Sequence, residues 1–183
     1  MKDVSIKKNR YEMDMCSGAL LPKILLYSLP LMLSGILQLL FNAADVVVVG
    51  RFAGSDALAA VGSTSSLINL LVNVFMGLSV GTNVMVARFF GAGQKKELEE
   101  MVHTAILTSI VSGVVLVFVG LILSRPALLL MDTPEDVIDQ AVLYIRIYFV
   151  GMPVMMLYNF GSAVLRAVGD TRRPLYFLMI AGV

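Results

Sequence analysis

Long apolar runs separated by short charged segments make up most of the chain after residue 23. Three runs contain no Asp, Glu, Lys or Arg: 57–87, 101–124 and 147–165. Between Lys23 and Arg51 the only charged residue is Asp45. A membrane-spanning helix needs roughly 20 apolar residues, so each run can cross a bilayer. The pattern predicts four transmembrane helices, over about 24–49, 60–86, 101–123 and 142–165, with a partial fifth over 174–183.

The domain organisation follows from this pattern. We expect a basic cytoplasmic tail over 1–23 and a helical membrane lobe over 24–183. The final segment 174–183 is about half a crossing long at roughly 1.5 Å per residue, so the lobe is expected to be truncated inside a helix. The composition agrees with a membrane protein, because 58% of residues are hydrophobic and only 15% are charged, with a mean hydropathy of +0.86.

The distribution of lysine and arginine predicts an orientation. Eleven of the 14 basic residues lie in the tail up to Lys23, in the segment 88–96 and in the segment 166–173. These three segments fall on the same side of the predicted helices. Cytoplasmic loops are enriched in Lys and Arg, so we expect a cytoplasmic N-terminus in a plasma membrane, the inner membrane of a prokaryote.

Polar residues inside the first two predicted helices form stripes. In the first helix, the stripe covers an arc of about 80° and contains Ser34, Gln38, Asn42 and Asp45. In the second helix, a similar stripe contains Ser65, Asn69, Asn73, Met76 and Asn83. Unpaired polar groups facing lipid cost several kcal/mol each, so both stripes are expected to face a common interior.

Two interpretations of these stripes remain open. The amides can line a cavity, or they can join helices by hydrogen bonds worth about 0.6 kcal/mol each. Asp45 can act as a functional carboxylate, or it can lie in water, because it is only about 7 Å from the helix end. The Gly77–Gly81 pair predicts a close helix contact, and the aromatic residues at 144, 148 and 149 predict an interface belt.

Two loops contain helix boundary signals. The segment "GDTRRP" predicts a helix end at Gly169 and a helix start at Pro174. The segment "DTPEDV" predicts that Asp132 or Thr133 caps the helix that follows Pro134.

Enzymatic and nucleic-acid functions find no support in the residues. We find one aspartate in the spans but no second carboxylate or nucleophile–base pair, so the sequence predicts no enzyme. No metal-ligand spacing, cofactor motif or nucleotide-binding glycine loop is present. A net charge of +1 offers no surface for a nucleic acid.

Three segments carry a resemblance to a known family. They are "LPLMLSGILQLLFNAADVVVVGRFAGSDALAAVG", "GLSVGTNVMVARFFGAGQ" and "YNFGSAVLRAVGDTRRP". Together, in this order, they resemble the multidrug and toxic compound extrusion (MATE) transporters. The resemblance implies an all-α fold of twelve helices in two lobes, of which this chain is most of the first. It also implies a remaining lobe as partner.

The resemblance further implies a function and its residues. Transporters of this family expel cationic amphipathic compounds by alternating access, in exchange for protons or sodium. The family's ion-coupling residues correspond to Asp45, Gln38 and Asn159, with Asp45 and Asn159 as the oxygen ligands if the ion is sodium. The candidate cavity-lining residues are Asn42, Asn69, Asn73 and Met76. The alternatives are a lipid-linked sugar flippase of the same superfamily and a non-transporting membrane fragment.

Overall fold

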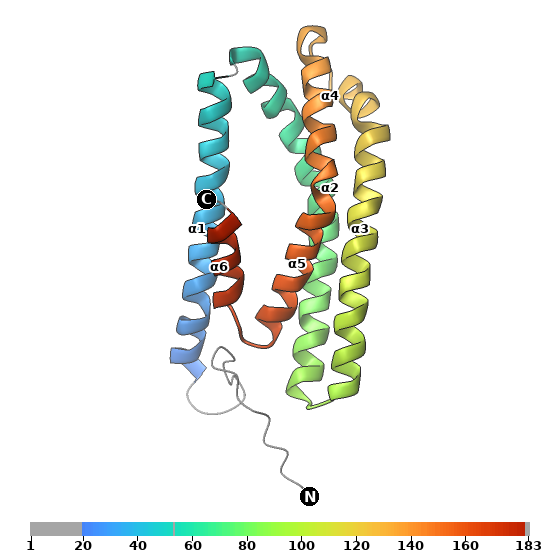
Figure 1. Cartoon of the computed structure of the whole chain (residues 1–183). Helices are drawn as coiled ribbons and strands as arrows, with labels where there is room; N and C mark the ends of the chain where they lie inside the picture. The colour runs from blue at the N-terminus through green and yellow to red at the C-terminus, as the bar shows by residue number, and fades with distance from the viewer. Residues whose placement is uncertain (1–19, 53, 182–183) are drawn as a thin grey trace, which may run out of the picture.

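The computed structural model describes residues 20–52 and 54–181, and these residues are arranged in six helices joined by short turns (Figure 1). The helices are α1 (Leu20–Phe52), α2 (Gly54–Gly91), α3 (Lys95–Leu130), α4 (Glu135–Val150), α5 (Met152–Ala167) and α6 (Arg172–Ala181). The predicted all-α fold is therefore confirmed. Most of the predicted basic tail, residues 1–19, lies outside the described residues.

Three helices are each long and apolar enough to cross a membrane: α1, α2 and α3. The helices α4 and α5 reach this length only together, and they are bent by 46° at their junction. We expected one helix over 142–165, but the chain breaks at Gly151. Pro153 explains the break, because it stands in the first turn of α5 and has no N–H to continue the helical hydrogen bonds of α4.

The third helix is also longer than predicted. It begins at Lys95 and includes the charged residues before 101. Charged residues end an apolar run but are good helix formers, so the hydrophobic pattern locates the membrane portion of a helix and not its ends.

The core lies where α3, α4 and α5 meet α2. Its fully buried side chains include Leu116, Ile145, Phe149, Met152 and Met156. The burial of Phe149 corrects the predicted interface belt, because this ring packs inside the protein. By contrast, α1 packs only against α2 and α6 within the described part of the chain, and its most apolar stretch has no buried residue.

Two glycines of α3 allow the bent pair to approach closely. A methyl group at Gly120 would overlap the Phe149 ring, and one at Gly113 would overlap the backbone of Pro153. The predicted contact at Gly77 and Gly81 is wrong, because no described atom lies within 4 Å of a methyl group placed at either residue. The small-residue pattern alone does not identify which helix face has a neighbour.

The turns at the two ends of the molecule differ in charge. The start of α1, the α2–α3 turn and the α5–α6 turn lie together at the lower end in Figure 1. We call this the basic end, because it carries Lys95, Lys96, Arg166, Arg172 and Arg173. The α1–α2 and α3–α4 connections lie at the opposite end.

The boundary at "GDTRRP" is as predicted, while that at "DTPEDV" is not. Gly169 has a φ of +88° directly after α5, and Pro174 lies in the first turn of α6. At the other boundary the N-cap of α4 is Pro134, without a side-chain hydrogen bond. Asp132, with a φ of +52°, and Thr133 instead donate their N–H groups to the last carbonyls of α3, and among the described residues neither side chain accepts a hydrogen bond from the start of α4.

We predict that Gly120→Ala destabilises the protein by about 1–3 kcal/mol, because the Phe149 ring must shift. The measurement is the midpoint of thermal loss of the monodisperse peak in detergent. The matched control is Gly81→Ala, which adds the same methyl group in open space and should keep or slightly raise this midpoint. Equal midpoints for the two variants would contradict the packing described here.

Candidate functional site

The carboxylate of Asp45 is exposed on α1. It lies in the half of α1 farther from the basic end, six residues before Arg51. Its negative charge acts through space on the phenol of Tyr144 in α4, although α1 and α4 do not pack against each other among the described residues. The Tyr144 ring lies 6.3 Å from that of Tyr148, centroid to centroid. Asp45 is therefore an exposed carboxylate whose charge reaches one tyrosine of an aromatic pair.

Tyr144 is the residue that the sequence analysis did not select. We assigned it to an interface belt because it lies near the outer end of a predicted span. The available signal was the Tyr144–Tyr148 spacing, which places both rings on one face of a helix. Nothing in the sequence indicates that the charge of Asp45 reaches this face.

The other predicted ion-coupling residues are not gathered around Asp45. Gln38 lies on α1 and is exposed. The side-chain amide of Asn159 in α5 donates to the Met155 carbonyl of its own helix, at 3.0 Å. In the described residues no hydrogen bond joins Asp45, Gln38 and Asn159, and α1 does not pack against α5.

The polar stripe of α2 divides into two parts. The amide of Asn83 donates to the Ala163 carbonyl of α5, at 2.7 Å. For this residue, the interpretation as a hydrogen bond between helices is confirmed. The remaining candidates of this stripe and Asn42 of α1 are exposed: Asn69, Asn73 and Met76. Their side chains are therefore accessible to a ligand in the part of the chain that the structure describes.

A pocket of about 440 Å³ lies between α3, α5 and α6. Apolar side chains dominate its wall, among them Ile106, Leu157, Phe160, Leu165 and Phe177. The predicted site residues do not line it. The pocket and the polar stripes are therefore separate features of the molecule.

The exposed face of α1 carries polar side chains that can bind a cation or a proton. Asp45, Asn42 and Gln38 repeat at intervals of three and four residues, so their oxygens lie along one side of the helix. A carboxylate and two amides can bind a cation or exchange a proton with water. Tyr144 can donate a hydrogen bond to the carboxylate if α1 moves closer to α4.

Comparison with known proteins places this geometry in context. The family model described as MatE matches residues 30–183. The "Probable multidrug resistance protein YoeA" of Bacillus subtilis (strain 168) is 37% identical over 158 residues, which are 86% of this chain and 34% of that protein. The chain therefore spans about a third of the length of this relative.

Solved structures are similar in fold. One is described as "Crystal structure of MATE in the bent conformation", with a TM-score of 0.80 and 26% identity, covering 87% of this chain and 36% of that one. Another, described as "Crystal structure of MATE in the straight conformation", has the same TM-score and identity and covers 87% and 35%. This chain matches both conformations equally well.

We predict that Asn83→Ala lowers the stability by about 0.5–1.5 kcal/mol, because the hydrogen bond to the Ala163 carbonyl is lost. The matched control is Asn73→Ala on the same helix, where the amide is exposed, and it should leave the thermal midpoint in detergent unchanged. A larger drop in the thermal midpoint for Asn73→Ala than for Asn83→Ala would contradict the assignment of Asn83 as the bonded amide and Asn73 as the exposed one.

Proposed function

This chain belongs to the MatE family, and from that premise we propose that it is part of a cation-coupled antiporter that exports cationic amphipathic compounds by alternating access. The family consists of membrane transporters and not of enzymes. The observation that carries the proposal is the position of Asp45, an exposed carboxylate inside a membrane-spanning helix. An ionisable residue at such a depth is costly, so it is expected to have a function.

The coupling step of the proposed cycle takes place at Asp45. The carboxylate binds either a proton or sodium from one side of the membrane and releases it to the other. Neutralising this charge removes its electrostatic effect on Tyr144 and is proposed to change the position of α1. A bound proton or sodium ion shifts the equilibrium between two positions of α1 only by the difference in its affinity for them. The change in charge at Asp45 supplies this difference.

The packing of α1 supports the proposal. Among the described residues this helix packs on α2 and α6 and donates one hydrogen bond to α5, and Pro30 interrupts its backbone hydrogen bonds. A change in its position therefore breaks few of the described contacts. For sodium, the proposed ligands are Asp45 and Asn159, and Gln38 is the third proposed ion-coupling residue. In the described state the Asn159 amide nitrogen is bonded within α5, while its oxygen can still accept a cation.

The proposed substrate contacts lie on the two polar stripes. Asn42 on α1 and Asn69, Asn73 and Met76 on α2 are exposed, and together they offer amide groups and a flexible thioether. Met side chains adapt to varied apolar shapes. The relative YoeA, described as a probable multidrug resistance protein, supports a substrate of this kind. The bilayer and the remaining lobe of the transporter are the proposed partners.

The proposed location is the plasma membrane, with the basic end in the cytoplasm. The membrane assignment agrees with the bacterial relatives. The orientation follows from the positive-inside rule, and all the basic turns that the rule assigns to the cytoplasm are at one end of the fold.

We predict that Asp45→Asn in the full-length transporter reduces ion-driven efflux of a fluorescent cationic dye to the background of cells without the transporter. The amide is similar in shape but cannot release a proton or neutralise sodium. Membrane insertion should be normal, measured as the amount of protein in the membrane fraction.

The matched control is Asp139→Asn, which removes a carboxylate at the exposed end of α4. Asp139 lies 3.4 Å from Arg125, and its side chain is 82% exposed, so this pair contributes little. Efflux by Asp139→Asn should equal that of the parent protein. Unchanged efflux by Asp45→Asn would rule out this carboxylate as the coupling group.

For the orientation we predict opposite reactivities of two single cysteines in a background in which Cys16 and any cysteine of the remaining lobe are replaced by serine. Glu135→Cys in α4 should react with a membrane-impermeant maleimide in intact cells. Gln94→Cys in the α2–α3 turn should react only after permeabilisation. Both native side chains are exposed, so accessibility within the protein does not limit either reaction. The reverse pattern would place the basic end outside.

A further inference from the structure

The α5–α6 turn at the basic end has a fixed backbone geometry. Gly169 adopts a φ of +88°, which a residue with a side chain rarely tolerates. Its N–H donates to the Arg166 carbonyl at 3.0 Å, and the N–H of Asp170 donates to the Leu165 carbonyl at 2.9 Å. The last turn of α5 is therefore closed by the residues that follow it.

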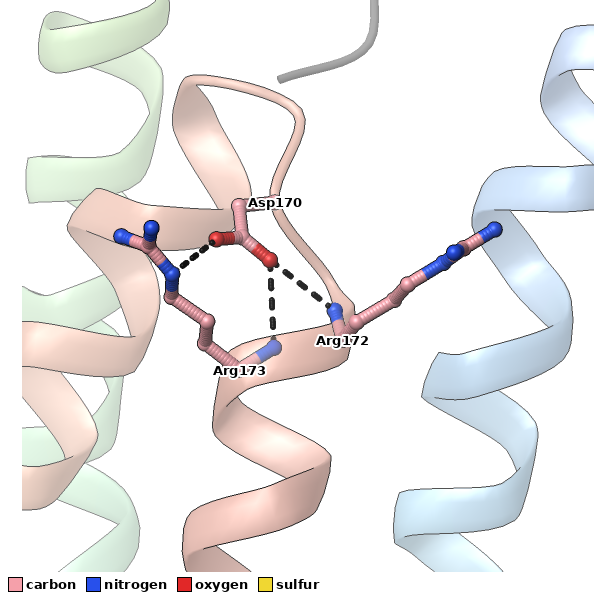
Figure 2. Close-up of polar contacts among 3 residues, drawn as sticks. All are labelled: Asp170, Arg172 and Arg173. Carbon is pink, nitrogen blue, oxygen red and sulfur yellow. Dashed lines mark hydrogen bonds and ion pairs between the residues drawn. The ribbon is translucent and has the colours of Figure 1, made fainter. Parts of the chain in front are cut away.

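The carboxylate of Asp170 joins this turn to α6. One oxygen accepts hydrogen bonds from the backbone N–H groups of Arg172 and Arg173, each at 3.1 Å. The other oxygen lies 3.2 Å from the Nε of Arg173, as Figure 2 shows. Asp170 is only 2% exposed, so these bonds are protected from water. A charged cap in this position stabilises the helix start.

A second contact fixes the position of α6 on α5. The phenol of Tyr158 donates to the Pro174 carbonyl at 3.2 Å. The cap at Asp170 and this hydrogen bond lie on either side of the first turn of α6. The direction in which α6 leaves the turn is therefore set by two independent interactions.

The first helix is bonded to the same turn. The phenol of Tyr27 in α1 donates to the Arg166 carbonyl at 3.0 Å, the oxygen that also accepts the Gly169 N–H. A carbonyl oxygen has two lone pairs and can accept both bonds. Tyr27 thus joins α1 to α5 by a hydrogen bond, in addition to the packing of α1 on α2 and α6.

We propose that the α5–α6 turn anchors α1 at the basic end: Asp170 holds the turn, the turn presents the Arg166 carbonyl, and Tyr27 binds α1 to it. Among the described residues, no hydrogen bond joins the half of α1 that carries Asp45 to another helix. Tyr27 therefore holds the basic end of α1 in one position relative to α5. Tyr27 and Asp170 are positioning residues for the proposed transport cycle, so this inference rests on the proposed function.

The test measures distances between spin labels in the full-length protein reconstituted in nanodiscs, in a background in which Cys16 and any cysteine of the remaining lobe are replaced by serine. One pair reports on the basic end, with labels at Ile24→Cys of α1 and His103→Cys of α3. A second pair reports on the Asp45 end, with labels at Val47→Cys of α1 and Leu130→Cys of α3. All four native side chains are exposed. In the parent protein the basic-end pair should give one narrow distance distribution.

The expected result is that Tyr27→Phe adds longer distances to the basic-end pair. The matched control is Tyr176→Phe, which removes a hydroxyl from an exposed tyrosine of α6 and should leave the distribution unchanged. Asp170→Ala should resemble Tyr27→Phe, while Asp170→Asn keeps an oxygen for the two backbone N–H groups and should stay close to the parent protein.

An unchanged basic-end distribution in Tyr27→Phe would overturn the proposal, and this variant decides the question even where Asp170→Ala does not fold. The outcome is separable from that for transport. If the α5–α6 turn anchors α1, the Asp45→Asn variant keeps the narrow distance distribution of the basic-end pair, whatever its effect on efflux. Unchanged efflux in Asp45→Asn together with a narrow distance distribution of the basic-end pair would contradict the proposed function and still support the anchoring of α1 by the α5–α6 turn.

Discussion

The packing of the bent α4–α5 pair on α3 is the interaction on which the rest of the structure depends. Gly120 gives space to the Phe149 ring, and Gly113 gives space to the backbone at Pro153. The contact lies on both sides of the break at Gly151, so it fixes the bend between the two helices. In lipid, helices associate through close packing and not through the hydrophobic effect, and small residues at these two positions allow it.

This packing divides the molecule into a dense part and a loosely packed part. The dense part contains α2, α3, α4 and α5, with the buried side chains of Phe149, Met152 and Met156 at its centre. The loosely packed part is α1, which depends on α2, α6 and the hydrogen bond from Tyr27. Among the described residues, displacing α1 breaks fewer contacts than displacing α3, which would expose the core. The proposed coupling carboxylate lies on this loosely packed helix.

Polar groups within the spans have two different uses. Asn83 satisfies its amide by bonding to a carbonyl of another helix, and Asn159 bonds within its own helix. Asp45, Asn69 and Asn73 remain exposed. In lipid an exposed polar side chain needs water or a ligand as its partner. The exposed set therefore marks the surface where we expect water, ions and substrates, and the bonded set maintains the arrangement of the helices.

The sequence by itself determined the all-α membrane fold, the approximate spans and the gathering of basic turns, because hydrophobic run length and charge are local properties of the chain. It also identified Asp45 as the unusual residue of the first helix. Only the tertiary structure decided that, among the described residues, Gly113 and Gly120 are the packing glycines instead of Gly77 and Gly81, that Asn83 joins helices, and that the charge of Asp45 reaches Tyr144. These facts depend on which helix faces meet, and residues far apart in the chain decide that together.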